Sequence, residues 1–137
     1  MKHVLVISLT IGLLLGGCAL FSQHILVNKA LVVNETGERI TDIRIVHRPT
    51  NKYAAVNLIL PHEVFSLGVF EQRMLGSEAD VSWRYGDGPL RHRRLTLPTL
   101  ASLPHVDADE VMVLVYSITA ADVVVHMVPA GQSPHLE

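Results

Sequence analysis

The chain has 137 residues and a formal net charge of −2 at pH 7, from 11 lysines and arginines against 13 aspartates and glutamates. This mild acidity excludes general nucleic-acid binding, which needs a strongly basic domain. Cys18 is the only cysteine. An internal disulfide and a cysteine-based metal site are therefore excluded as well.

The first eighteen residues have the pattern of an export segment. Lys2 and His3 give a positive start, residues 4–15 form an uncharged apolar run, and two glycines precede Cys18. A charged start, an apolar run and small residues before a cleavage site predict a secretory signal peptide. The sequence Leu15-Gly16-Gly17-Cys18 resembles the lipobox of bacterial lipoproteins.

The resemblance implies that residues 1–17 are removed, that the Cys18 sulfur receives a diacylglyceryl group, and that the new amino terminus is acylated. Ala19, in place of the Asp that retains such proteins in the inner membrane, implies sorting to the outer membrane, facing the periplasm. Three alternatives stay open: an uncleaved transmembrane helix over residues 4–21, an ordinary signal peptide with a coincidental cysteine, and a buried apolar strand.

The mature chain divides into a short tether over residues 18–24, a β domain over 25–128 and a flexible polar tail over 129–137. Residues 25–33 and 39–47 read as two strands around a turn-type cluster, and we expect them to form an opening hairpin. Residues 53–60 form a third strand, with Val56, Leu58 and Leu60 predicted to face together, until Pro61 ends it.

Residues 63–70 favour a strand followed by a turn, with a helical turn over 70–75 as the alternative. Residues 79–85 and 90–97 alternate around Gly86-Asp87-Gly88-Pro89, which predicts a hairpin. Residues 111–118 are apolar on both faces and predict a central, doubly covered strand. Residues 123–128 are equally apolar.

This pattern predicts an all-β fold: an antiparallel β-sandwich of about seven or eight strands, immunoglobulin-like or transthyretin-like, after an N-terminal signal helix. Trp83 is expected to pack between the two sheets. The residues after Cys18 are not matched to a named family.

Four arginines lie around the predicted hairpin turn, and they are the candidate contact for an anionic partner: Arg84, Arg91, Arg93 and Arg94. Guanidinium groups suit phosphate because they donate paired hydrogen bonds. Strand alternation puts Arg91 and Arg93 on one face and Arg94 on the other, with His92. The alternative is a solvated hairpin that keeps a sheet edge soluble.

No catalytic motif is found. The histidines lack metal-ligand spacing, residues 105–110 lack the glycine and the distant glutamate of a calcium loop, and no Gly-x-Ser-x-Gly sequence is present. We therefore predict no metal, no cofactor and no enzymatic activity, although His, Asp and Ser residues that converge in space would still allow one. The expected function is a membrane-anchored interaction or assembly module with an envelope protein as partner. The alternative is a lipoprotein that binds a small ligand, glycan or lipid.

Overall fold

The computed structural model describes residues 26–73, 76–99, 102–103 and 110–134. The signal segment, Cys18 and the whole tether lie outside these residues, as does most of the acidic loop over 105–110. The lipoprotein anchor and its alternatives therefore stay predictions. Within the described ranges, no helix is long and apolar enough to cross a membrane.

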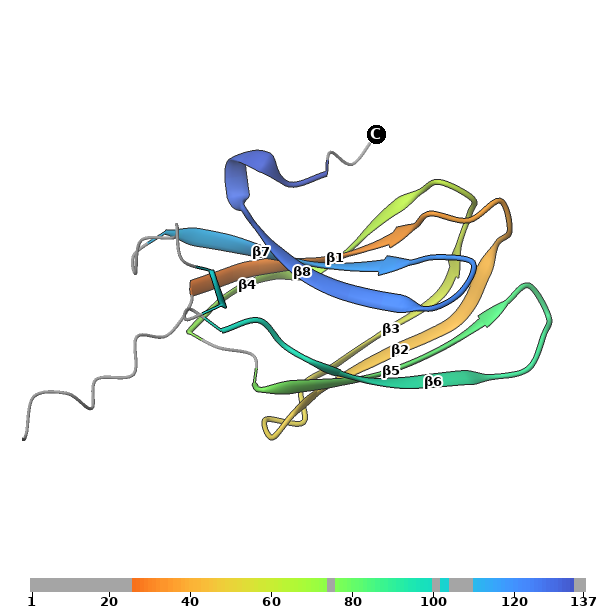
Figure 1. Cartoon of the computed structure of the whole chain (residues 1–137), viewed down its shortest axis with the longest axis horizontal. Coiled ribbons are helices and arrows are strands. Elements are labelled where there is room, and N and C mark those ends of the chain that lie inside the picture. The colour runs from red at the N-terminus through yellow and green to blue at the C-terminus, as the bar shows by residue number, and fades with distance from the viewer. Residues whose placement is uncertain (1–25, 74–75, 100–101, 104–109, 135–137) are drawn as a thin grey trace, which may run out of the picture.

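Within these ranges, eight strands form two four-stranded sheets that pack face to face (Figure 1). We name them sheet A, with the order β4-β1-β7-β8, and sheet B, with the order β3-β2-β5-β6. The elements are β1 (Leu26–Asn34), β2 (Ile40–Arg48), β3 (Tyr53–Ile59), β4 (Val64–Arg73), β5 (Glu78–Tyr85), β6 (Arg91–Thr96), β7 (Val111–Ile118), β8 (Val123–Pro129) and a short 3-10 helix, η2 (Ala130–Gln132). The all-β sandwich predicted from the sequence is confirmed, and β4 is a strand throughout rather than a helical turn.

The predicted opening hairpin is wrong, because β1 lies in sheet A and β2 in sheet B. The buried side chain of Asn34, at the end of β1, explains the crossing. Its amide donates to the carbonyls of Glu38, Ile59 and Leu60, which holds the turn against the end of β3 in sheet B. In the immunoglobulin fold the first two strands share a sheet.

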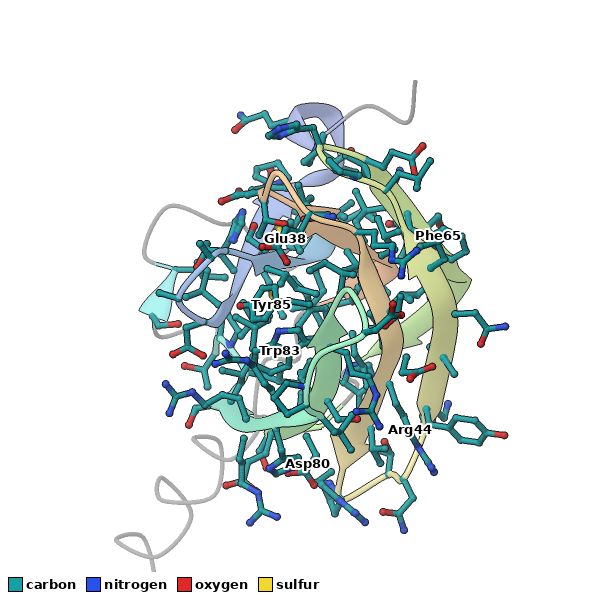
Figure 2. All side chains as sticks on the ribbon, turned by 90° about the vertical axis from the view of Figure 1, so that its right-hand side faces the viewer. Glu38, Arg44, Phe65, Asp80, Trp83 and Tyr85 are labelled. Atoms are coloured by element: carbon teal, nitrogen blue, oxygen red, sulfur yellow. The ribbon has the colours of Figure 1, made fainter. Side chains whose placement is uncertain are left out.

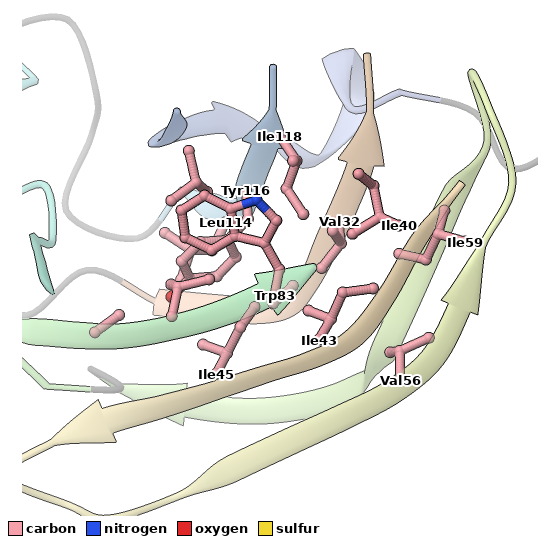
Figure 3. Close-up of a cluster of buried hydrophobic side chains, with 14 of the residues drawn as sticks. Val32, Ile40, Ile43, Ile45, Val56, Ile59, Trp83, Leu114, Tyr116 and Ile118 are labelled. Carbon is pink, nitrogen blue, oxygen red and sulfur yellow. The ribbon is translucent and has the colours of Figure 1, made fainter. Parts of the chain in front are cut away.

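The core lies between the sheets, where alternate residues of each strand point inward. Trp83 is only 2% exposed and lies within this core, as predicted (Figure 3). β7 is a central strand between β1, its parallel neighbour, and β8. Its outward residues Val113 and Val115 are buried in a second cluster, against which Val128 and Ala130 pack. The expected double coverage of β7 is confirmed.

The predicted facing of β3 fails after Val56. Ile59 is buried, whereas Leu58 and Leu60 are 47% and 46% exposed. The cause lies in β2, where Asp42 has a φ of 51° and the register with β5 shifts. Such a bulge inserts one residue into the alternation. β3 follows β2, because Ile43 pairs with Val56 and Ile40 with Ile59. The two buried residues on each strand are therefore three positions apart, whereas strict alternation requires an even number.

Candidate functional site

The sandwich has two flanks, each formed by one edge strand from each sheet. We call them the β6–β8 flank and the β3–β4 flank. The first contains three of the four candidate arginines, on β6. The second contains four large apolar side chains that the fold leaves exposed. They are Tyr53 and Leu58 on β3, Leu60 in the turn between β3 and β4, and Phe65 on β4.

β6 pairs with β5 and places its charges on both sides, as alternation predicts. Arg94 points to the outer face of sheet B, where its Nε donates to Asp80 Oδ1 at 2.9 Å. Arg48 of β2 donates to Asp80 Oδ2 at 3.1 Å, and His92 Nε2 lies 3.7 Å from Oδ1. The hydrogen bonds from Arg94 and Arg48 hold the pKa of the Asp80 carboxyl below its usual value.

The other two β6 arginines lie on the opposite side of the strand. Arg93 donates from two nitrogens to the Asp122 carboxylate, in the turn between β7 and β8. This pair connects sheet B to sheet A across the flank, and Arg93 is the main cause of the lowered pKa of Asp122. The Arg91 guanidinium lies 4.9 Å from the centroid of the Tyr85 ring, within the range of a cation–π contact.

Arg84, on β5, also has a partner. Its Nε donates to Asp42 Oδ2 at 2.9 Å, and another nitrogen donates to the Gly88 carbonyl. The fold therefore does not bring the four candidate arginines to one place, and each has a contact within the protein. An anion arriving here would compete with Asp80, Asp122 or Asp42. The anionic contact stays a prediction. These internal pairs favour the alternative, in which the arginines keep the sheet edge soluble.

The β3–β4 flank has the opposite chemistry. β3 is an edge strand on which Tyr53 is 69% exposed, and the Arg44 guanidinium lies 5.3 Å from its ring centroid. Phe65 of β4 is 42% exposed and lies on the same flank, far from Trp83 in the interior (Figure 2). β3 and β4 are in contact along the flank. The flank thus combines a backbone edge with apolar side chains.

Sequence reasoning identified β3 as a strand and missed that it forms an edge. No local signal marked it as an edge, since residues 53–59 contain no charge, glycine or proline, the features that usually protect edge strands. Only the strand order shows that β3 is the last strand of sheet B among the described residues. The exposure of Leu58 and Leu60 was missed for another reason. A regular alternation would place both leucines on the buried face, and the bulge at Asp42 breaks that alternation.

Among the described residues, the polar groups inside the sandwich include one pair that joins the two sheets, while Asn28 Oδ1 and Trp83 Nε1 are buried without a hydrogen-bond partner. His47 Nε2 and the Tyr116 hydroxyl lie 2.7 Å apart and join sheet B to sheet A in the core. Burial lowers the pKa of His47 to about 4, so the imidazole is neutral at pH 7. In the part of the chain that the structure describes, no three metal-ligating side chains come together.

Comparisons of the chain with protein-family models, with curated proteins and with solved structures found no match.

Proposed function

We propose that the protein is a lipoprotein of the bacterial envelope, anchored through Cys18, whose sandwich binds an envelope protein through the β3–β4 flank. The observation that carries the proposal is the uncharged edge strand β3 with its exposed Tyr53 and Leu58. An open sheet edge offers backbone donors and acceptors to an added strand, and neighbouring apolar side chains give that strand a surface to cover.

Two further observations support binding over catalysis. The one described histidine–aspartate approach, between His92 and Asp80, involves a carboxylate that two arginines already occupy. Trp83 and Tyr116 are buried in the core, so the large exposed aromatic side chains of the described residues are Tyr53 and Phe65, on the β3–β4 flank itself. A small ligand, glycan or lipid would therefore have to bind at this same flank.

Site-specific photocrosslinking in intact cells tests the interaction. A photoreactive residue replaces Tyr53 on β3 or, as the matched control, Thr96 on β6, the other edge strand of sheet B. We expect a protein adduct from position 53, a much weaker one from position 96, and loss of the first when Cys18→Ala removes the anchor. Equal adducts from both edges, or none from position 53, would refute the proposal.

The anchor has its own test, which is mass spectrometry of the mature protein. We expect a chain that begins at Cys18 and has the added mass of a diacylglyceryl group and an amide-linked acyl chain. An unmodified Cys18, or an intact Met1, would contradict the lipoprotein assignment.

A further inference from the structure

We propose that the occupant of the β3 edge is β3 of a second copy of this chain, paired antiparallel about a two-fold axis at Ala55. This inference rests on the proposed function, since it names the protein that the β3–β4 flank binds. The pairing joins two copies of sheet B into one continuous sheet.

The first argument compares the four edge strands, because natural sheets protect their edges with charges, prolines, bulges or covering segments. β6 has four cationic or titratable residues among its six. β4 contains Gly68 at a φ of 119° and shifts its register twice against β1. β8 ends at Pro129, and η2 follows directly. β3 has none of these features, and its register with β2 is unbroken.

The second argument fixes the register. The carbonyls of Ile59 and Leu60 already accept hydrogen bonds from the Asn34 amide, and strict alternation ends at Asn57. The regular edge is therefore residues 53–57. Residues directly opposite in an antiparallel pair share a face. A symmetric pairing that uses all five residues is centred on Ala55.

This register fits the side chains. Ala55 lies opposite Ala55 of the second copy, and their small size allows the two strands to approach closely. Tyr53 lies opposite Asn57 of the second copy, with Leu58 of that copy beside it. The five paired residues have no charge, and the nearest cation on the same face, Arg44 of β2, lies over the Tyr53 ring of its own copy.

The third argument concerns concentration. Five residues per strand bury less than the roughly 1,000 Å² of a stable solution interface. Lipid anchors hold all copies at one surface, however, and a raised local concentration makes a weak contact effective. Antiparallel pairing points the two Leu26 ends in opposite directions. Both anchors then reach one membrane with the strands lying along its surface, and a six-residue tether spans about 20 Å for this purpose.

The test is a cysteine substitution in the full-length protein, expressed in the envelope where disulfides form. In a lipidated chain the Cys18 sulfur is a thioether, so Ala55→Cys supplies the only free thiol. Opposite Cα atoms lie about 4.5–5.5 Å apart in an antiparallel pair, which suits a disulfide. On a non-reducing gel we expect Ala55→Cys to give at least roughly fivefold more dimer than Thr96→Cys on β6.

A second pair of variants checks the register. Tyr53→Cys and Asn57→Cys should each remain monomeric alone and should form a mixed dimer when expressed together. The inference is overturned if Ala55→Cys gives no more dimer than Thr96→Cys. It is also overturned if the mixed dimer does not form although thermal melting shows that each variant is folded. A crosslink from Tyr53 to another protein would then leave the proposed function standing. Disulfide dimers of the unsubstituted chain would instead show a free Cys18, which contradicts the anchor.

Discussion

The two flanks of the sandwich both contain unpaired sheet edges, but they differ in how those edges are protected. Each has two edge strands whose backbone groups would pair with another chain unless something prevents it. The β6–β8 flank is blocked by cationic side chains, and Arg93 closes it by pairing with Asp122 of the other sheet. The β3–β4 flank has no charge on β3 and exposes Tyr53 and Leu58. The difference shows that an open edge is a local property of this fold and is not imposed by the sandwich.

The largest expected effect concerns the contact between His47 and Tyr116, which holds the two sheets together and therefore supports both flanks. Because the pKa of His47 is lowered from 6.5 to about 4, the unfolded chain takes up a proton in that interval and the folded protein does not. The free energy of unfolding should therefore fall by roughly 3 kcal/mol between pH 7 and pH 4.

Urea denaturation across this pH range measures the effect. His47→Gln should flatten the pH dependence, whereas His126→Gln, on an exposed residue of β8, should preserve it. Asp80 and Asp122 have lowered pKa values and keep their charge through most of this interval. An unchanged slope in His47→Gln would show that another group controls acid stability.

A second change affects the β3–β4 flank alone. Asn34→Ala removes the amide that binds the C-terminal end of β3 and leaves the buried carbonyl of Ile59 and the part-buried carbonyl of Leu60 without that donor. We expect a loss of about 1–3 kcal/mol, the range for an unsatisfied buried polar group. Thermal melting gives the loss, and amide exchange at Ile59 shows whether it is local. Asn57→Ala, on the exposed edge of β3, should stay within about 0.5 kcal/mol of the original.

A third change tests whether charge is what blocks the other flank. Replacing Arg91 and Arg94 together by threonine leaves β6 a strand and removes two of its charges. Light scattering should then detect self-association at a several-fold lower protein concentration. Arg39→Thr, in the turn before β2, is the control and should not change the onset. Equal behaviour of the two proteins would mean that β6 is blocked by something other than charge.

The smallest effect is expected from the pair that closes the β6–β8 flank. Both side chains of the Arg93–Asp122 pair are partly exposed, and exposed ion pairs contribute little to stability. Arg93→Ala should lower the melting temperature slightly, and added salt should reduce the difference. In a double-mutant cycle, Asp122→Ala should add little to Arg93→Ala. Fully additive losses would show that the two residues act independently.

The sequence predicted the strands far better than their pairing. Alternation over residues 79–85 and the turn at 86–89 identified β5 and β6 as partners, because turn chemistry and register are both local. The assignment of β1 and β2 to different sheets depends on Asn34 contacting residues some 25 positions away, which no local pattern reports. The arginines were found as a cluster in the sequence. Their separation by Asp80, Asp122 and Asp42 required the three-dimensional pairing.

The bulge at Asp42 in β2 determines which apolar side chains the neighbouring strand β3 exposes. One residue with a left-handed backbone shifts the phase of two neighbouring strands, and this phase decides whether Leu58 faces water. Removing the bulge would restore alternation beyond Val56, so that Leu58 and not Ile59 would face the core, while Tyr53 would stay exposed. The side chain that this end of the edge shows to water is thus set by the neighbouring strand, without any change in the residues of β3.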